Sequence, residues 1–248
     1  MPDPIGTISI DRRYCGPARS GNGGYVCGQL ANFIDGPARA KLIKPPPLET
    51  RIDVFSEDSG IVAYAGDTKI GMAEPASVDI NLPAIPSEEG IRAAHETYLK
   101  GADTHPLAQC FVCGPKRKPG DALRLFTGPV PDSPVNADTW TPSEDFAGED
   151  GLVRPEILWA ALDCPTAFAL RHGDTRLCLL AALTADIYRR PKPGERLIVM
   201  AWARGVEGRK NFGDGALIDE NGEVIAAANA LWIELTDPAM IAAVTAGA

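Results

Sequence analysis

The stretch RPKPGERLIVMAWARGVEGRKNFGDGALIDENGEVIAAANALWIEL, residues 190–235, decides the fold because it predicts consecutive β-strands. It contains three apolar runs separated by short polar turns: RLIVMAWARGV, GRKNFGDGALID and EVIAAANALWIEL. Asn221-Gly222 joins the last two runs, and Asn-Gly between alternating apolar runs is the strongest short signal for a β-hairpin. The stretch therefore predicts neighbouring strands of an antiparallel sheet.

A helix and one more strand come before this stretch. The apolar segment PEILWAALDCPTAFAL begins at residue 155 and predicts a helix over about 155–164. The run LLAALTADIYRR, residues 179–190, then predicts a strand, and the break PKPG at 191–194 separates it from the next strand. One helix followed by four strands is the order predicted for the second half of the chain.

The first half repeats this order. SGNGGYVCGQLANFI at 20–34 predicts a helix from Gly23 to about Asp35, which Gly36 and Pro37 then end. Four short strands are expected after it, at 38–43, 50–55, 61–65 and 68–74. Prolines follow the first strand after the helix in both halves, so we interpret the chain as an internal duplication.

A connecting helix lies between the two halves. Residues 87–105 predict a helix that is capped by Ser87 and turns apolar side chains inward, namely Ile91, Ala94 and Tyr98. The predicted domains are therefore an N-terminal repeat at 1–86, the linker helix at 87–105, and a C-terminal repeat at 106–248. In this α+β fold each repeat wraps an antiparallel sheet around one central helix.

Composition and charge exclude several classes of protein. The 248 residues carry a formal net charge of -9, which argues against a nucleic-acid-binding protein. No signal peptide is recognisable, and the longest apolar runs fall short of the ~20 residues that span a bilayer. The six cysteines do not form the pattern of a small disulfide scaffold. We therefore expect a cytoplasmic protein with no membrane partner.

The helix-and-strand pattern resembles the hotdog fold of acyl-CoA thioesterases, and the tail at 190–235 is closest to the phenylacetate-pathway branch. The segment CFVCGPKRKPGDALRL at 110–125 is similar to the opening strand of many such domains. The resemblance covers nearly the whole chain as a tandem double hotdog. It implies hydrolysis of an acyl-CoA to the free acid and coenzyme A, no cofactor beyond the coenzyme A of the substrate, and a homodimer of double hotdogs as the candidate assembly.

Each half of the chain retains a different part of the family's site. Members of this branch carry His-Gly-Gly at the helix start and an acid nine positions after the histidine. Asn22-Gly23-Gly24 matches the first part with asparagine in place of histidine, but the acidic position falls on Ala31. In the second half Asp163 supplies the acid and the glycine pair is absent. The resemblance therefore implies one composite site between the repeats.

The chemistry of thioester hydrolysis gives these residues roles. Amides of Gly23 and Gly24 at the helix start are expected to bind the oxyanion. Asp163 is expected to activate a water or to attack the carbonyl and form an anhydride, and the sequence does not choose between these routes. Asn22 adds an amide donor, and Thr166, one turn after Asp163, is expected to position the water.

Further residues are expected to bind the substrate. Gly23 and Tyr25 lie at the helix start, beside the expected thioester. Basic residues on strand ends are candidates for the coenzyme A phosphates: Arg189, Arg190, Lys192, Arg209 and Lys210. The alternative is that these side chains are ordinary solvent-exposed surface residues with no binding role.

Structural alternatives remain open at each motif. Asn22-Gly23-Gly24 also fits a plain loop and cap, and Asp163 also fits the cap of a short second helix before Pro165. In either case the protein would be a non-catalytic acyl-thioester binding or regulatory protein. Cys110-x-x-Cys113 with His105 lacks a fourth metal ligand, so we expect no metal and a turn at a strand start.

Overall fold

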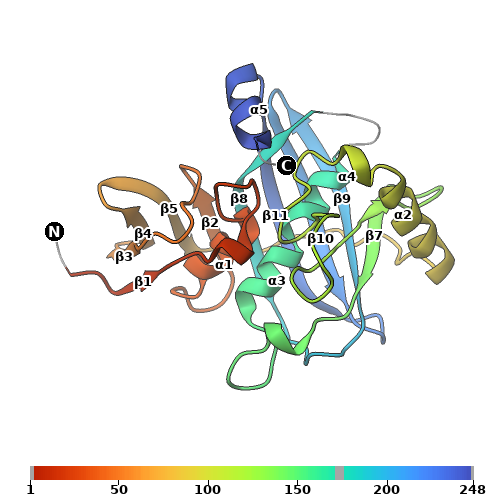
Figure 1. Cartoon of the computed structure of the whole chain (residues 1–248). Helices are drawn as coiled ribbons and strands as arrows, with labels where there is room; N and C mark the ends of the chain where they lie inside the picture. The colour runs from red at the N-terminus through yellow and green to blue at the C-terminus, as the bar shows by residue number, and fades with distance from the viewer. Residues whose placement is uncertain (1–2, 171–175, 247–248) are drawn as a thin grey trace.

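The computed structural model describes residues 3–170 and 176–246. Within them, eleven strands form one sheet in the order β1-β3-β4-β5-β2-β8-β11-β10-β9-β7-β6, and neighbouring strands pair antiparallel (Figure 1). The strands of the N-terminal half are β1 Gly6–Ile8, β2 Ala38–Leu42, β3 Ile52–Glu57, β4 Gly60–Ala65 and β5 Thr68–Pro75. Those of the C-terminal half are β6 Gly128–Pro129, β7 Val135–Trp140, β8 Cys178–Ile187, β9 Leu197–Glu207, β10 Lys210–Ile218 and β11 Val224–Glu234.

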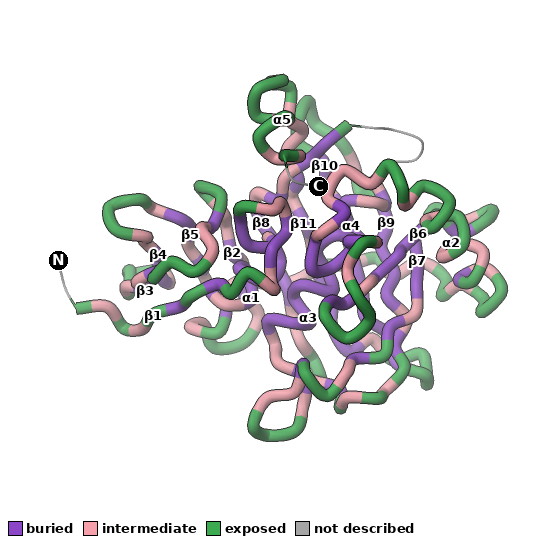
Figure 2. Tube along the Cα trace, in the orientation of Figure 1, coloured by how far each residue is buried: buried purple, intermediate pink, exposed green. Residues whose placement is uncertain are grey.

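Helices lie against this sheet and at its ends. The α-helices are α1 Gly23–Ala31, α2 Glu88–Lys100, α3 Pro155–Ala161, α4 Asp163–Ala169 and α5 Pro238–Thr245. Short 3-10 helices span Arg12–Tyr14, Ala102–Thr104 and Glu144–Phe146. The tube in Figure 2 shows that α1, α3 and α4 are largely buried, whereas α5 is exposed.

The two halves of the chain meet through strand pairing and through helix contact. Strand β2 pairs with β8, with Ala38 opposite Ala185, so one sheet runs through both halves. Helix α1 of the first half lies beside α3 of the second (Figure 1). A Cβ on Gly28 would lie 2.5 Å from Cα of Glu156, so only glycine allows this approach. The predicted α+β architecture of sheet and central helices is confirmed.

The hairpin prediction from the tail is also confirmed. Strands β9, β10 and β11 pair in sequence, and the turn between β10 and β11 contains Asn221-Gly222. Gly222 has φ +81°, a backbone conformation that side chains disfavour, and its amide donates to Asp219 O at 3.0 Å. The turn chemistry thus fixes the register that the apolar alternation requires.

Three helix boundaries differ from the sequence prediction. The linker helix predicted over 87–105 ends at Lys100, and a short 3-10 helix, Ala102–Thr104, follows it. Helix α1 ends at Ala31, and only a turn follows, with the Ile34 amide bonded to Ala31 O. The single helix predicted near 155–164 is divided at Leu162 into α3 and α4. Pro165 explains the division, because it has no N–H to continue the helix and is tolerated only in the first turn of a new one.

The segment 110–125 is not the opening strand that its resemblance implies. It forms turns, with the Gly114 amide bonded to Cys110 O at 2.9 Å, and it lies against the first half through Phe111 N and Cys15 O at 2.7 Å. Glycine, proline and lysine dominate 114–120, which favours turns over a ladder. The strands that open this half are β6 and β7, and neither they nor β1 was predicted.

The linker helix covers the end of the sheet formed by β6 and β7. Helix α2 begins after Ser87, whose hydroxyl accepts from the Gly90 amide at 3.2 Å, as predicted. Ile91 and Ala94 are buried against this end of the sheet, and Tyr98 is half-buried. The contact is close, because a Cβ on Gly128 of β6 would overlap the Ala94 carbonyl.

A buried carboxylate supports this end of the sheet. Asp138 of β7 is 2% exposed and accepts hydrogen bonds from Phe126 N at 2.6 Å and His95 Nδ1 at 2.9 Å. Asp138→Ala would leave the amide of the buried Phe126 without its acceptor and would remove the partner of His95, so we expect a loss of about 3 kcal/mol in the free energy of unfolding. Urea denaturation measures it, with the exposed Glu96→Ala on α2 as control. Equal stability of the two variants would contradict this role.

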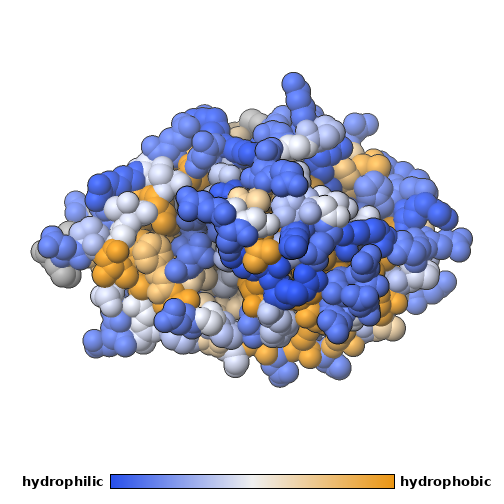
Figure 3. Space-filling view, turned by 90° about the horizontal axis from the view of Figure 1, so that it is seen from below, coloured by the Kyte–Doolittle hydropathy of each residue, from blue (hydrophilic) through white to orange (hydrophobic). Residues whose placement is uncertain are grey.

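The surface is mainly hydrophilic, with separated apolar patches on the face seen in Figure 3. The large apolar side chains that are exposed come from different elements and connections: Ile5, Ile43, Ile85, Leu99, Tyr188, Val206 and Met240. Among the described residues, we find no helix whose length and apolar character would let it cross a membrane.

Candidate active site

A cavity lies where the start of α1 meets the start of α4. It has a volume of about 80 Å³, room for several water molecules, and its lining is mostly apolar. Both halves of the chain contribute to it. Its lining includes polar side chains, cysteine side chains and the exposed backbone of one glycine: Asn22, Gly23, Cys110, Cys113, Asp163 and Cys164.

Asn22 links the two halves in the lining of this cavity. It is the N-cap of α1, and its Oδ1 accepts from the Tyr25 amide at 2.9 Å. Since Oδ1 is held in this way, Nδ2 faces the second half and donates to Asp163 Oδ2 at 2.7 Å. The plain capping role and the predicted contact with the acid therefore coexist in one side chain.

Asp163 is buried at the first position of α4. Its side chain does not cap that helix but points toward α1. Burial raises the pKa of Asp163 to about 7, against the lowering effect of the nearby Gly24 amide and of the hydrogen bond from the Asn22 side chain. A carboxyl group with a pKa in this range can accept and release a proton near neutral pH.

Gly24 allows the start of α1 to pack closely against α3 and α4, which brings Asn22 and Asp163 together. A Cβ at Gly24 would lie 2.4 Å from Cβ of Asp163 and 2.7 Å from the Trp159 carbonyl oxygen. The bare backbone at Gly24 thus accommodates the second half of the chain, whereas the sequence led us to expect a substrate there. Gly23 is the residue of the pair that lines the cavity, and as the first residue of α1 its amide has no partner within the helix.

Thr166 and Tyr25 lie near the cavity without lining it. The Thr166 hydroxyl donates to the Asp163 carbonyl oxygen at 2.7 Å and accepts from Trp232 Nε1 at 2.9 Å. Its hydrogen is therefore committed to the backbone rather than directed at a water. The Tyr25 ring stacks on Tyr14 at 4.0 Å between centroids, and its hydroxyl accepts from Gln29. Neither residue therefore has the role in the reaction that the sequence predicted for it.

The basic residues proposed for phosphate binding do not line this cavity. Arg189 pairs with Glu195 at 2.8 Å and Asp219 at 3.1 Å, and Arg190 pairs with Asp150 at 2.6 Å. Lys192 lies in the same loop region as Arg189, beside the β10–β11 turn. Arg209 and Lys210 are in the β9–β10 hairpin, at its exposed end. The structure therefore brings none of these five to the Asn22–Asp163 contact.

Cysteine side chains adjoin Asp163, which the sequence analysis did not predict. Sγ atoms of Cys110, Cys113 and Cys164 lie within 4.8 Å of one another, and those of Cys110 and Cys164 are 3.7 Å apart. Hydrogen bonds from the other two thiols lower the pKa of Cys110 well below its usual range. The Cys110-x-x-Cys113 spacing is visible in the sequence, but nothing in it signals that Cys164 joins the pair.

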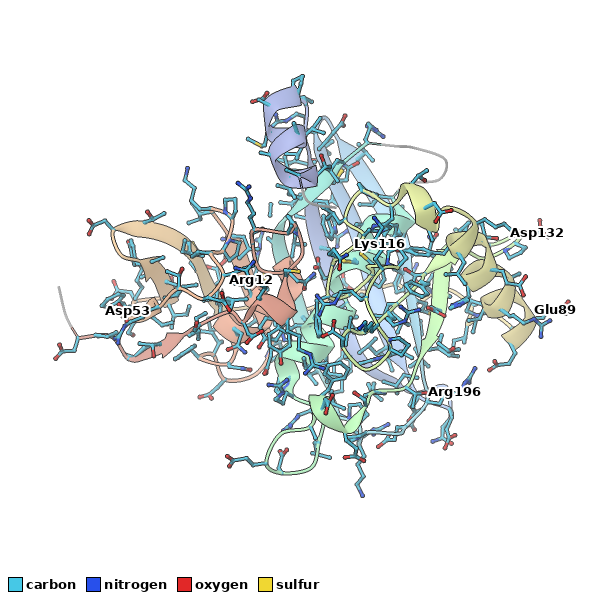
Figure 4. The ribbon with its side chains drawn as sticks, in the orientation of Figure 1. Arg12, Asp53, Glu89, Lys116, Asp132 and Arg196 are labelled. Carbon is cyan, nitrogen blue, oxygen red and sulfur yellow. The ribbon has the colours of Figure 1, made fainter. Side chains whose placement is uncertain are left out.

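The remaining predicted neighbour of the cysteine pair is His105. It lines the cavity, and its Nδ1 accepts from the Leu107 amide at 3.1 Å. The turn after Cys113 continues to Lys116, which Figure 4 labels near the middle of the molecule, with Arg12 labelled beside α1. The Cys110–Cys113 turn and the start of α1 both contribute lining residues to the cavity, from the two halves of the chain.

Comparison with known proteins identifies the architecture. No protein-family model matches the chain, and no curated protein matches it. Among solved structures, the TesB protein of Mycobacterium avium subsp. paratuberculosis aligns over 88% of this chain and 89% of its own, with TM-score 0.57 and 14% identity. The acyl-CoA thioesterase II TesB2 of Mycobacterium marinum aligns over 94% and 93%, with TM-score 0.58 and 13% identity. The chain therefore has the tandem double hotdog fold of these proteins.

Proposed function

We propose that the protein hydrolyses an acyl thioester at one composite site in each chain. The observation that carries this proposal is the 2.7 Å hydrogen bond between Asn22 of the first half and Asp163 of the second, at a cavity lined by both. These two residues belong to incomplete motifs in different repeats of the sequence. Their contact supports the interpretation that the two incomplete motifs complement each other.

In the proposed reaction the thioester carbonyl lies beside the start of α1. The Gly23 amide and the positive end of the α1 dipole stabilise the oxyanion. Asp163 either takes a proton from the attacking water or attacks the carbonyl to form an anhydride that water then opens. On either route the C–S bond breaks, water supplies the hydroxyl of the acid, and the thiol leaves with a proton.

Apolar side chains beside Asp163 suit the acyl group. Leu107, Phe168, Leu180 and Trp232 line the same cavity. An acyl-CoA is the proposed substrate, because the similar proteins include one named an acyl-CoA thioesterase. Since Arg189 and Arg190 are paired with carboxylates at a distance from the cavity, we do not assign the coenzyme A phosphates to them.

A second candidate function is binding of an acyl thioester without hydrolysis. The observation that favours it is the burial of Asp163, which is 2% exposed and already bonded to Asn22. In that case the carboxylate would lock α1 to α4 and take no part in chemistry. Release of free thiol separates the two functions, because a binding protein leaves the thioester intact.

We expect the purified protein to release free thiol from at least one member of a panel of aliphatic and aromatic acyl-CoA esters. A non-hydrolysable acyl-CoA analogue should saturate near one per chain, because one Asn22–Asp163 pair forms per chain. Calorimetric titration measures this ratio. Two equal sites per chain would contradict the composite site, and saturable binding without thiol release would favour the binding protein.

A further inference from the structure

The cluster of Cys110, Cys113 and Cys164 has the geometry of a metal site. Four tetrahedral ligands at the zinc–sulfur distance of about 2.3 Å lie about 3.8 Å from one another. The Cys110 and Cys164 sulfurs are 3.7 Å apart, and all three sulfurs lie within 4.8 Å of each other. Small rotations of side chains therefore bring three sulfurs around one ion.

A hydrogen-bond donor beside the cluster can stabilise a thiolate, which is the form of cysteine that binds metals. Nδ2 of Asn22 lies 3.9 Å from both the Cys110 and the Cys164 sulfur. Hydrogen-bond donors directed at sulfur stabilise its negative charge, and the thiolate is the metal ligand.

The turn that carries the first two ligands is tight and specific. The Gly114 amide bonds to Cys110 O at 2.9 Å, and a Cβ on Gly114 would lie 2.5 Å from that oxygen. Glycine after Cys113 thus lets the chain fold back so that both sulfurs point the same way. Cys164 completes the set from the first turn of α4, across 54 residues of sequence.

We propose that these three cysteines bind one zinc ion at the edge of the active-site cavity. All three line the cavity, so the fourth position of the tetrahedron faces it and takes a water. The ion would link the turn at 110–113 to α4 through Cys164. Because Asp163 is the residue before Cys164, this link would also hold Asp163 in position. This proposal replaces the expectation of a metal-free chain, which rested on the lack of further ligands near Cys110 in the sequence.

The test measures metal uptake by the full chain and does not depend on turnover. Reduced protein is treated with a chelator, incubated with zinc chloride and freed of unbound metal. We expect about one zinc per chain by elemental analysis. Cobalt added instead should give thiolate-to-metal charge-transfer absorption and the intense visible bands of a tetrahedral site.

Matched variants locate the site. Cys164→Ala should lower the affinity for cobalt at least ~10-fold. The control is Cys27→Ala, which should retain the wild-type affinity because Cys27 is a buried residue of α1 that does not line the cavity. Absence of cobalt charge-transfer bands in the reduced wild-type protein would overturn the proposal. Unchanged cobalt affinity in Cys164→Ala would overturn it as well. Thiol release by the metal-free chain would leave the proposed function standing on its own.

Discussion

Asp163→Asn should lower thioester turnover by at least ~10²-fold, the contribution of a positioned general base or nucleophile. Asparagine retains the shape of the side chain and one carbonyl acceptor for Asn22 Nδ2, so the 2.7 Å link between the halves has a replacement. It cannot take up a proton or form an anhydride. The rate of free-thiol release at saturating acyl-CoA measures the loss, and affinity for a non-hydrolysable analogue should change little.

The control for this variant is Asp186→Asn. Asp186 lies in β8 and is half-buried, but it does not line the cavity, so turnover should stay near wild type. If Asp163 is only a structural lock, Asp163→Asn should retain near-full activity while Asp163→Ala loses stability. Near-full activity of Asp163→Asn on a good substrate would therefore remove Asp163 from the mechanism.

Most strands of the fold could be predicted because their signals are local. Alternating apolar residues and Asn221-Gly222 predict β10 and β11 without knowledge of their partners. Strands β6 and β7 were missed because β6 has two residues and β7 carries polar residues such as Asn136 and Asp138, whose burial depends on partners elsewhere. A buried polar strand gives no alternation from which to predict it.

The candidate site could be predicted only in part for a similar reason. The contact of Asn22 with Asp163 followed from comparing two repeats, and the structure places the two in contact across 141 residues. The role of Gly24 was not predictable, because a glycine at a helix start fits both substrate access and close helix packing. Cys164 gives no signal of its own, since a single buried cysteine in an apolar helix is an ordinary core residue.

Gly24→Ala should separate the two halves of the active site and so impair both stability and activity. The added methyl group would lie 2.4 Å from Cβ of Asp163 and 2.7 Å from the Trp159 carbonyl oxygen, and backbone on both sides prevents easy relief. Overpacking of this kind costs about 1–3 kcal/mol, against a gain of roughly 0.5–1 kcal/mol from the better helix propensity of alanine. Displacement of Asp163 by about 1 Å should lower turnover by ~10²-fold in the molecules that remain folded.

Gly28→Ala distinguishes loss of stability from loss of the site. Its Cβ would lie 2.5 Å from Cα of Glu156, which is about two helical turns before Asp163, so it should weaken the α1–α3 contact to a similar extent. Turnover per folded molecule, measured below the unfolding transition, should fall much less than in Gly24→Ala, because the residues at the cavity stay in place. Gly101→Ala, whose Cβ meets only Tyr98 O at 3.6 Å, serves as the neutral control for both measurements. Equal activity per folded molecule in the Gly24 and Gly28 variants would mean that the distance between α1 and Asp163 does not govern the reaction.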